Sequence, residues 1–252
     1  MLQINDTVYA EQPLVADEGF QFGRGIYETI LIHRRPVFWA EHCQRLNQGL
    51  AHLAIDRVVD PAQLLDQVEQ LGLMCCVLKV IATAENLVLM TRPIPEALPD
   101  PVMRLTLQPD TRSTDLRLLQ NKTLSYLPNL LAWQDARRSG FDDVLFFEPG
   151  GLIRECSRSN IYIIREQRIL TPEDACGLLP GTVRRWLLSE GLVSTGRFTQ
   201  ADILSADCVF ASNAVIGIRR VSDLDGHRFN DHLLLQEVIR RYRQQIVEPA
   251  QR

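Results

Sequence analysis

Asn121-Lys-Thr-Leu-Ser-Tyr-Leu-Pro128 is the stretch from which the fold of this 252-residue chain can be worked out. It holds Lys122, which with Lys79 makes up the only two lysines among 27 basic residues. A lysine amine can condense with an aldehyde and later carry a proton, whereas an arginine guanidinium stays protonated. A helix is predicted directly after it, from Ser125 to Ser139, with its proline in the first turn and Gly140 as its stop. Lys122 is therefore the first candidate for covalent chemistry.

The sequence after this helix alternates strand and helix signals. The strands that we expect are 143–147, 160–164, 207–211 and 216–221, and the helices are 182–190 and 231–245. The first two strands are joined through the turn Pro149-Gly-Gly151. Helices and strands are mixed without a βαβ repeat, which favours an α+β fold over a doubly wound sheet.

The sequence before Lys122 predicts a smaller unit of the same class. Hairpins are expected at 3–8 and at 26–39, helices at 41–53 and at 61–72, and strands at 74–83, 87–90 and 103–107. Between Arg92 and Asp115 the chain has four prolines and then Gln108-Pro-Asp-Thr-Arg-Ser-Thr-Asp115, which indicates turns and solvated polar sequence. We place the junction there and expect two domains, residues 1–110 and 118–252.

The composition and charge of the chain make some classes of partner less favourable than others. The net charge is −4 and the pI is about 5.8, which disfavours nucleic acid and anionic membranes as partners. No run of 18 apolar residues and no signal peptide is found, so we expect a cytoplasmic protein without a membrane partner. The six cysteines lack Cys-x-x-Cys spacing and are expected to be reduced, and no metal site is predicted.

Four segments, taken together, resemble the class IV aminotransferase family, the pyridoxal-phosphate enzymes of fold type IV. They are Asp17-Glu-Gly-Phe-Gln-Phe-Gly-Arg-Gly-Ile-Tyr-Glu-Thr29, Lys122-Thr-Leu-Ser-Tyr-Leu-Pro-Asn-Leu-Leu-Ala132, Gly151-Leu-Ile-Arg-Glu-Cys-Ser-Arg-Ser-Asn160 and Gly177-Leu-Leu-Pro-Gly-Thr-Val-Arg184. Weaker matches are His42-Cys-Gln-Arg45 and Ser212-Asn-Ala-Val-Ile-Gly-Ile218. The glycines of the first segment do not follow a strand and open a helix, so they are no dinucleotide fingerprint.

The resemblance implies a fold, a cofactor and an assembly. The expected fold has a small N-terminal α/β sandwich and a larger C-terminal barrel-like domain, with pyridoxal 5'-phosphate at the cleft between them. It also implies a homodimer whose partner helps to close the site.

The resemblance assigns roles to particular residues. Lys122 matches the lysine that bonds to the cofactor aldehyde and then acts as base and acid, and Glu155 matches the carboxylate that faces the pyridine nitrogen. A phosphate turn is implied at Leu179-Pro-Gly-Thr-Val183 before a helix, where Leu179, Gly181, Thr182 and Val183 offer backbone N–H groups. The other implied contacts are Arg45, Tyr126, Asn213 and Ala214. Thr182 and Asn213-Ala214 depart from the commonest family pattern, which leaves the side-chain contacts there open.

The resemblance also points to a reaction. The segment from Lys122 and the short chain look most like the lyase that converts 4-amino-4-deoxychorismate to 4-aminobenzoate and pyruvate. Tyr27 and Thr29, two positions apart on a strand, are candidates for substrate contact and for protonating the leaving pyruvate.

One departure from the family leaves the substrate open. The usual Arg-Gly carboxylate anchor after the strand is replaced by Thr83-Ala-Glu-Asn86, so Arg24, Arg92 or a partner residue would have to hold the substrate. Lys79 is interpreted as a strand residue whose amine reaches an edge. The alternatives are a D-amino-acid or branched-chain transaminase and a protein that binds the cofactor without turnover.

Overall fold

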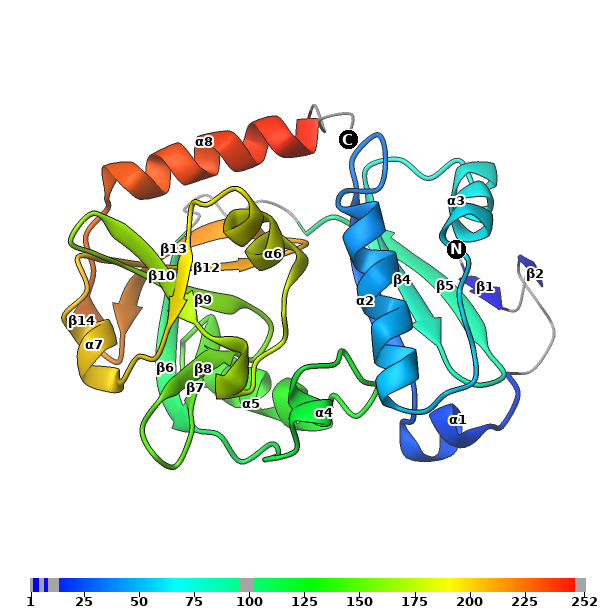
Figure 1. Cartoon of the computed structure of the whole chain (residues 1–252), viewed down its shortest axis with the longest axis horizontal. Coiled ribbons are helices and arrows are strands. Elements are labelled where there is room, and N and C mark those ends of the chain that lie inside the picture. The colour runs from blue at the N-terminus through cyan, green and yellow to red at the C-terminus, as the bar shows by residue number, and fades with distance from the viewer. Residues whose placement is uncertain (1, 5–6, 9–13, 96–101, 248–252) are drawn as a thin grey trace. The chain divides into compact units, whose positions relative to one another are not determined.

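The computed structural model describes residues 2–4, 7–8, 14–95 and 102–247 as two compact units. The first comprises Met1–Glu96 and Asn121–Ser125, and the second comprises Ala97–Gln120 and Tyr126–Arg252 (Figure 1). The chain therefore leaves the first unit, begins the second, and returns for five residues that include Lys122.

The first unit contains a sheet in the order β2-β1-β5-β4-β3. Its strands are β1 (Leu2–Ile4), β2 (Thr7–Val8), β3 (Ile26–Ile32), β4 (Cys76–Ala82) and β5 (Leu87–Pro93). The expected hairpin at 3–8 is confirmed by the antiparallel pairing of β1 with β2, although Asn5 and Asp6 lie outside the described residues. The second expected hairpin shrinks to one bridge between Ile32 and Pro36, because a helix already begins at Trp39.

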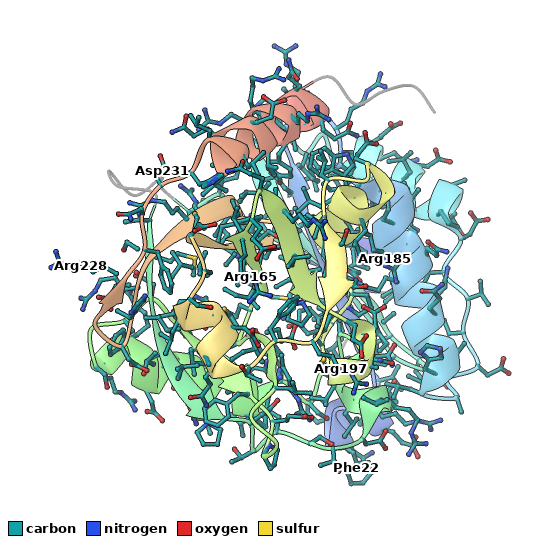
Figure 2. All side chains as sticks on the ribbon, turned by 60° about the vertical axis from the view of Figure 1, so that its left-hand side comes forward. Phe22, Arg165, Arg185, Arg197, Arg228 and Asp231 are labelled. Atoms are coloured by element: carbon teal, nitrogen blue, oxygen red, sulfur yellow. The ribbon has the colours of Figure 1, made fainter. Side chains whose placement is uncertain are left out.

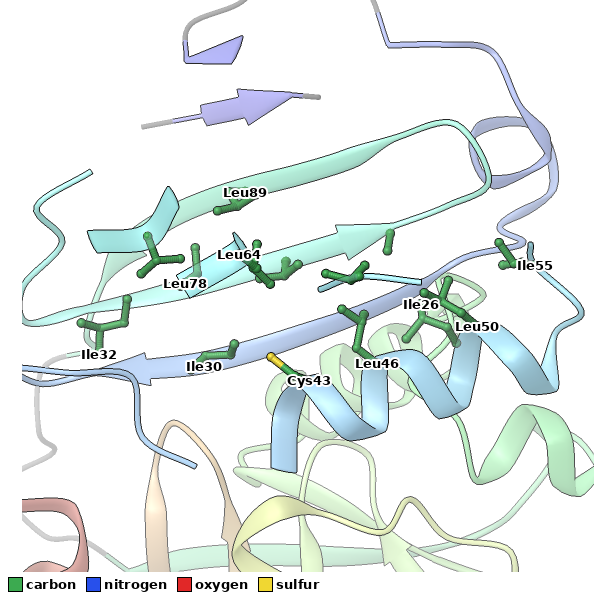
Figure 3. Close-up of a cluster of buried hydrophobic side chains, with 14 residues drawn as sticks. Ile26, Ile30, Ile32, Cys43, Leu46, Leu50, Ile55, Leu64, Leu78 and Leu89 are labelled. Atoms are coloured by element: carbon green, nitrogen blue, oxygen red, sulfur yellow. The ribbon is translucent and has the colours of Figure 1, made fainter. Parts of the chain in front are cut away.

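Two helices, α2 (Trp39–His52) and α3 (Pro61–Gln70), cover one face of this sheet, and a short helix α1 (Glu18–Phe22) precedes β3. Asp60 caps α3 as expected, since its carboxylate accepts hydrogen bonds from two N–H groups of the first turn. Cys43, Leu46 and Leu50 of α2 pack towards the isoleucines of β3 (Figure 3). A Cβ at Gly49 would stand 2.8 Å from Ile26, so this glycine lets α2 approach β3 closely.

The second unit is built on a nine-stranded sheet in the order β11-β10-β9-β12-β13-β6-β7-β8, with β14 paired to β13. The sheet curls within its unit (Figure 1), as the expected barrel-like domain requires. Its strands are β6 (Met103–Pro109), β7 (Asp143–Phe147), β8 (Ile153–Cys156), β9 (Asn160–Arg165), β10 (Arg168–Pro172), β11 (Ser194–Gly196), β12 (Cys208–Asn213), β13 (Gly217–Leu224) and β14 (His227–Arg228).

Helices lie around this sheet. They are α4 (Leu116–Leu119), α5 (Leu127–Arg138), α6 (Thr182–Ser189), α7 (Gln200–Leu204) and α8 (Leu233–Val247). Helix α5 has Pro128 in its first turn, and Gly140 follows it with a φ of 86°, so both termini confirm the prediction. The α+β class is likewise confirmed.

Two expectations about organisation need correction. Strand β6, placed by sequence in a domain of residues 1–110, hydrogen-bonds to β13 and β7 and so belongs to the second sheet. The segment 108–115 was expected to be solvated, yet the Asp110 side chain is fully buried and that of Arg112 is 7% exposed. Strands β8, β10, β11 and helices α1 and α7 were not anticipated, because each is short or lacks a full hydrophobic period.

Within the part of the chain that the structure describes, no helix combines the length and apolar character needed to span a bilayer. All six cysteines are free thiols. Cys75 is exposed, whereas Cys43, Cys156, Cys176 and Cys208 are buried.

Candidate functional site

Lys122 is held by backbone hydrogen bonds at the edge of the first sheet. Tyr27 N–H donates to the Lys122 carbonyl at 2.8 Å, and Leu124 N–H donates to the Gly25 carbonyl at 2.9 Å. An antiparallel bridge joins Ile26 and Thr123 between them. The segment therefore pairs with the start of β3 through one bridge, which fixes the position of the lysine backbone.

Both lysines of the chain contact the same aromatic ring. The Nζ atoms of Lys122 and Lys79 each lie 4.5 Å from the centroid of the Tyr27 ring. The two amines are therefore no farther apart than twice that distance. We refer to Tyr27, Lys79 and Lys122 as the lysine cluster.

The position of Lys79 corrects the sequence-based interpretation. Strand β4 lies between β3 and β5, so Lys79 is in the interior of the sheet and not at an edge. It is directly opposite Thr29 in the register of β3 and β4, and the alternation of side chains puts Thr29 and Tyr27 on its face. Burial and the nearby charge of Arg92 lower the pKa of Lys79 below its ordinary value.

The opposite face of β3 carries a buried ionic group. Glu28 is fully buried and accepts hydrogen bonds from Arg45, with Nε at 2.7 Å from Oε1 and Nη2 at 2.6 Å from Oε2. His42 Nδ1 lies 2.6 Å from the same Oε2. Burial opposes ionisation of Glu28, but the Arg45 charge and the hydrogen bonds outweigh it, and the pKa of Glu28 falls well below its ordinary value. Arg45, predicted to contact phosphate, is thus oriented by Glu28.

Arg24, predicted to contact substrate, contacts the C-terminal end of α2. Its Nε and Nη2 donate to the carbonyl of Leu53, Nη2 also donates to that of Ala54, and Nη1 pairs with Glu18. The Leu53 carbonyl, at the C-cap of α2, is a helix-end acceptor that a cation satisfies. A structural role for Arg24 accounts for all of these contacts.

In the second unit, Glu155 lies on β8 and is 6% exposed. Its Oε1 accepts a hydrogen bond from Arg112 Nη1 at 3.0 Å, and its Oε2 accepts one from Leu179 N–H at 3.1 Å. Leu179 belongs to the turn that enters α6, so the carboxylate and the predicted phosphate turn are tied by a direct bond. The carboxylate predicted to face the ring nitrogen and the predicted phosphate turn therefore lie next to each other.

The turn itself is closely packed. Gly181 is the N-cap of α6 and makes no side-chain cap, and Thr182 and Val183 behind it are buried. Asn160 Nδ2 donates to the Leu179 carbonyl at 2.8 Å, and a Cβ on Gly181 would stand 2.2 Å from Asn160 Oδ1. Only glycine fits here, because any Cβ would overlap Asn160 Oδ1. The backbone N–H groups at the start of α6 are the kind of donors that bind an anion.

Tyr126 and Asn213 both contact the turn that follows β8. The Tyr126 hydroxyl donates to the Ser157 carbonyl at 3.0 Å. Asn213 Nδ2 donates to the Arg158 carbonyl at 3.1 Å, and its Oδ1 accepts from Val215 and Ile216 N–H at 2.9 Å. Ala214 lies within the turn that these bonds close. The Asn213 side chain therefore fixes the turn at 213–216 and ties it to the turn after β8.

Comparison with known proteins assigns the family. The model for amino-transferase class IV matches residues 25–224, which is most of the chain. A D-alanine aminotransferase of Bacillus licheniformis is 28% identical over 239 residues, covering 84% of this chain and 83% of that protein. The chain belongs to the class IV aminotransferase family.

Two solved structures share the fold. A Legionella pneumophila structure assigned as a 4-amino-4-deoxychorismate lyase has a TM-score of 0.84 at 25% identity and covers 94% of this chain and 96% of that one. A hypothetical aminotransferase from Mycobacterium tuberculosis in its PLP-bound form has a TM-score of 0.84 at 21% identity, with 98% and 99% covered. The family uses pyridoxal phosphate, which is the cofactor of this chain.

The residues present fit that cofactor on chemical grounds. Lys122 supplies an amine on a fixed backbone, and Glu155 supplies a buried carboxylate. The Gly181 turn supplies a helix N-terminus without a side-chain cap. An amine, an anion for a ring nitrogen and donors for a phosphate are the three groups that pyridoxal phosphate needs.

Three features were missed by sequence reasoning: the proximity of Lys79 to Lys122, the Glu28–His42 pair, and Arg112. The first depends on which face of β4 carries the lysine, which alternation alone does not fix. Arg112 could have been found, because Asp-x-Arg in a turn favours the Asx geometry in which the Asp110 carboxylate accepts the Arg112 N–H.

Proposed function

We propose that this chain is a pyridoxal-phosphate-dependent lyase that converts 4-amino-4-deoxychorismate to 4-aminobenzoate and pyruvate. The observation that carries the proposal is the lysine cluster, in which a second amine lies against the same ring as the amine of Lys122. A substrate with two carboxylates needs cations beside the reacting centre, and the usual anchor loop is absent from this chain. Lys79 fills that need, with Arg92 as the neighbouring charge.

The proposed roles follow from the chemistry of each side chain. When bound, pyridoxal phosphate supplies an aldehyde for the substrate amine and a ring that withdraws electrons from the carbon losing its proton. Lys122 would take the proton from ring C4 of the substrate. Thr29 would direct a proton to the methylene carbon of the leaving enolpyruvyl group. Lys79 would hold a carboxylate throughout.

The remaining cofactor contacts are proposed as the family motif assigns them. Glu155 would face the ring nitrogen, and the backbone at Leu179, Gly181, Thr182 and Val183 would bind the phosphate. Arg45 would add a charge-assisted contact. Tyr126 would contact the ring oxygen, with Asn213 and Ala214 shaping the turn beside it. We further propose a homodimer, which light scattering at several protein concentrations tests directly.

A transaminase is the second candidate, because the D-alanine aminotransferase of Bacillus licheniformis is among the similar proteins. The same lysine and carboxylate serve both reactions, so the cofactor residues do not separate them. Lys79 separates them in principle, since an amino acid with one carboxylate needs only one anchor.

A single-turnover assay distinguishes the two reactions. The cofactor-loaded protein is mixed with 4-amino-4-deoxychorismate without any keto acid, and 4-aminobenzoate is followed by fluorescence. Rapid release supports the lyase. Conversion of the cofactor to its amine form by D-alanine or a branched-chain amino acid, and its recovery with a keto acid, would establish the transaminase instead.

The cofactor lysine is tested by reductive trapping. The loaded protein has an expected absorption band at roughly 410–430 nm, and borohydride followed by peptide mass analysis should place the cofactor on Lys122. The matched control is Lys79→Ala, which should keep both the band and the label. A label on Lys79 would overturn the assignment.

A further inference from the structure

Arg112 lies between two buried carboxylates of the second unit. Its Nη1 donates to Glu155 Oε1 at 3.0 Å, while its Nε and Nη2 donate to Asp110 Oδ1 and Oδ2 at 2.9 and 2.8 Å. The exposed fractions of the Arg112, Asp110 and Glu155 side chains are 7%, 0% and 8%. The guanidinium therefore bridges Asp110 to the carboxylate proposed to face the cofactor.

The side of Arg112 away from Glu155 is fixed from several directions. Asp110 Oδ1 also accepts the Arg112 backbone N–H at 3.0 Å, and Asp110 Oδ2 accepts a hydrogen bond from Arg154 at 2.8 Å. The guanidinium carbon stands 4.3 Å from the centroid of the Phe146 ring. A planar fork held by a bidentate carboxylate and an aromatic face has little rotational freedom.

This arrangement differs from that of the many arginines at the surface. Arg197 and Arg228 are exposed, and Arg228 projects outward from β14 (Figure 2). Exposed ion pairs contribute little free energy, whereas a desolvated pair is strong and costly to break. Burial opposes the charge of Arg112, but the hydrogen bonds and charges of Asp110 and Glu155 outweigh it, and the pKa of Arg112 is raised.

The consequence for Glu155 is a fixed charge and a fixed direction. Arg112 donates to one oxygen and Leu179 N–H donates to the other, so rotation of the carboxylate would break at least one of these hydrogen bonds. A guanidinium at hydrogen-bond distance also favours the carboxylate over the carboxylic acid. A carboxylate oxygen has more than one acceptor position, so one hydrogen bond does not use the full acceptor capacity of that oxygen.

We propose that Arg112, anchored by Asp110, is a positioning residue that keeps Glu155 ionised and aimed for the cofactor's ring nitrogen. The proposal rests on the role of Glu155 and not on which family reaction the chain catalyses. Arg112 acts through Glu155 and does not contact the reacting atoms.

The test compares two ligands in binding experiments. One is pyridoxal phosphate, and the other is its analogue with CH in place of the ring nitrogen. Dissociation constants are measured by absorbance for the wild-type protein, Arg112→Met and the matched control Arg117→Met, whose arginine is exposed and pairs with Asp115 outside this group. Loss of a hydrogen bond to a charged group predicts that Arg112→Met weakens pyridoxal phosphate binding about 10- to 100-fold.

Binding of the analogue shows whether Arg112 affects the affinity through Glu155 and the ring nitrogen. Arg112→Met should change its affinity by less than about threefold, because no ring nitrogen is present to be stabilised. Equal weakening of both ligands would overturn the proposal, since it would show general damage to the binding site. Arg112→Lys, which keeps the charge but not the fork, should give an intermediate loss. If Arg112→Met does not fold, Arg112→Gln carries the same comparison.

Glu155→Gln separates failure of this proposal from failure of the site assignment. If Glu155 faces the ring nitrogen, this variant also weakens pyridoxal phosphate more than the analogue. If the preference for pyridoxal phosphate over the analogue is lost in Glu155→Gln but kept in Arg112→Met, the role of Arg112 alone is refuted. If both variants keep the preference for pyridoxal phosphate over the analogue, the role of Glu155 is refuted, and the proposal for Arg112 is refuted with it.

Discussion

Thr29 and Lys79 are directly opposite each other in the antiparallel pair of β3 and β4. Residues in such positions have Cβ atoms about 4.5–5.5 Å apart and share one face of the sheet. That face also carries Tyr27, against whose ring the Lys122 amine lies. A hydroxyl, two amines and an aromatic ring are thereby brought together in the first unit by β3, β4 and the segment 121–125.

Thr29→Val should lower kcat while leaving cofactor affinity unchanged. The substitution keeps the shape and the strand preference but removes the hydroxyl that we propose directs a proton to the leaving group, and one proton-transfer group contributes about 10²- to 10⁴-fold. Thr29→Ser is the matched control and should retain most of the activity. A full rate in Thr29→Val, measured by 4-aminobenzoate release, would remove Thr29 from the catalytic group.

Lys79→Met should raise the KM for 4-amino-4-deoxychorismate by about 10- to 100-fold, as expected for loss of a charged hydrogen bond to a carboxylate. Arg92 remains and keeps some attraction for the anion. Lys79→Arg keeps the charge and should bind more tightly than Lys79→Met. An unchanged KM in Lys79→Met would contradict the anchor assignment.

The pKa of Lys79 gives this anchor a pH dependence. Because burial and Arg92 lower that pKa, the ammonium is lost at a lower pH than for an ordinary lysine, and anion binding is lost with it as the pH rises. We therefore expect kcat/KM of the wild-type protein to fall on its alkaline side. In Lys79→Arg the fall should move to higher pH, since guanidinium does not deprotonate in that range.

Glu28→Gln should destabilise the first unit by about 3–5 kcal/mol, because it leaves the Arg45 guanidinium buried without its anion. The depressed pKa of Glu28 means that its contribution is complete above its unfolded pKa and is lost as the pH falls through the folded one. The wild-type free energy of unfolding in urea should therefore decline in acid. Glu28→Gln should show a flatter acid dependence, and an equally steep one would contradict this account.

Gly181→Ala should weaken cofactor binding and cost about 1–3 kcal/mol of stability, since the new Cβ would overlap Asn160 Oδ1 and displace the start of α6. Gly150→Ala is the matched control, because its Cβ meets only the far end of Glu148 at 3.3 Å. Both variants are compared by thermal unfolding with and without pyridoxal phosphate. Equal behaviour of the two would show that the turn has more room than the structure gives it.

Local sequence signals predicted the parts of the site that depend on a turn or a helix entry. The proline of the first turn placed Lys122 before α5, and the Leu179–Val183 turn was predicted before α6 and found there. The same reasoning failed for Lys79, whose partners come from another strand through a register that no local pattern contains. Pairing between distant segments is what the sequence did not disclose.

Polar composition misled for a related reason. The segment around Asp110 and Arg112 has the composition of a solvated turn, yet the two side chains satisfy each other and can therefore be buried. The same holds for Glu28, which lies between Ile26 and Ile30 on one face of β3. It is paired with His42 and Arg45, which are 14 and 17 residues further along the chain. Burial of charge depends on partners, and composition counts residues without their partners.

The return of residues 121–125 to the first unit sets an order for its synthesis. Until these residues leave the ribosome, the edge at β3 is open. The Tyr27 N–H then lacks its acceptor, the Lys122 carbonyl, and the Gly25 carbonyl lacks its donor, the Leu124 N–H. An uncovered strand edge invites pairing with other chains. A fragment ending before residue 121 should therefore aggregate. A single cut in the chain cannot separate the complete first unit from the second, because residues 121–125, which complete the first unit, lie between two segments of the second.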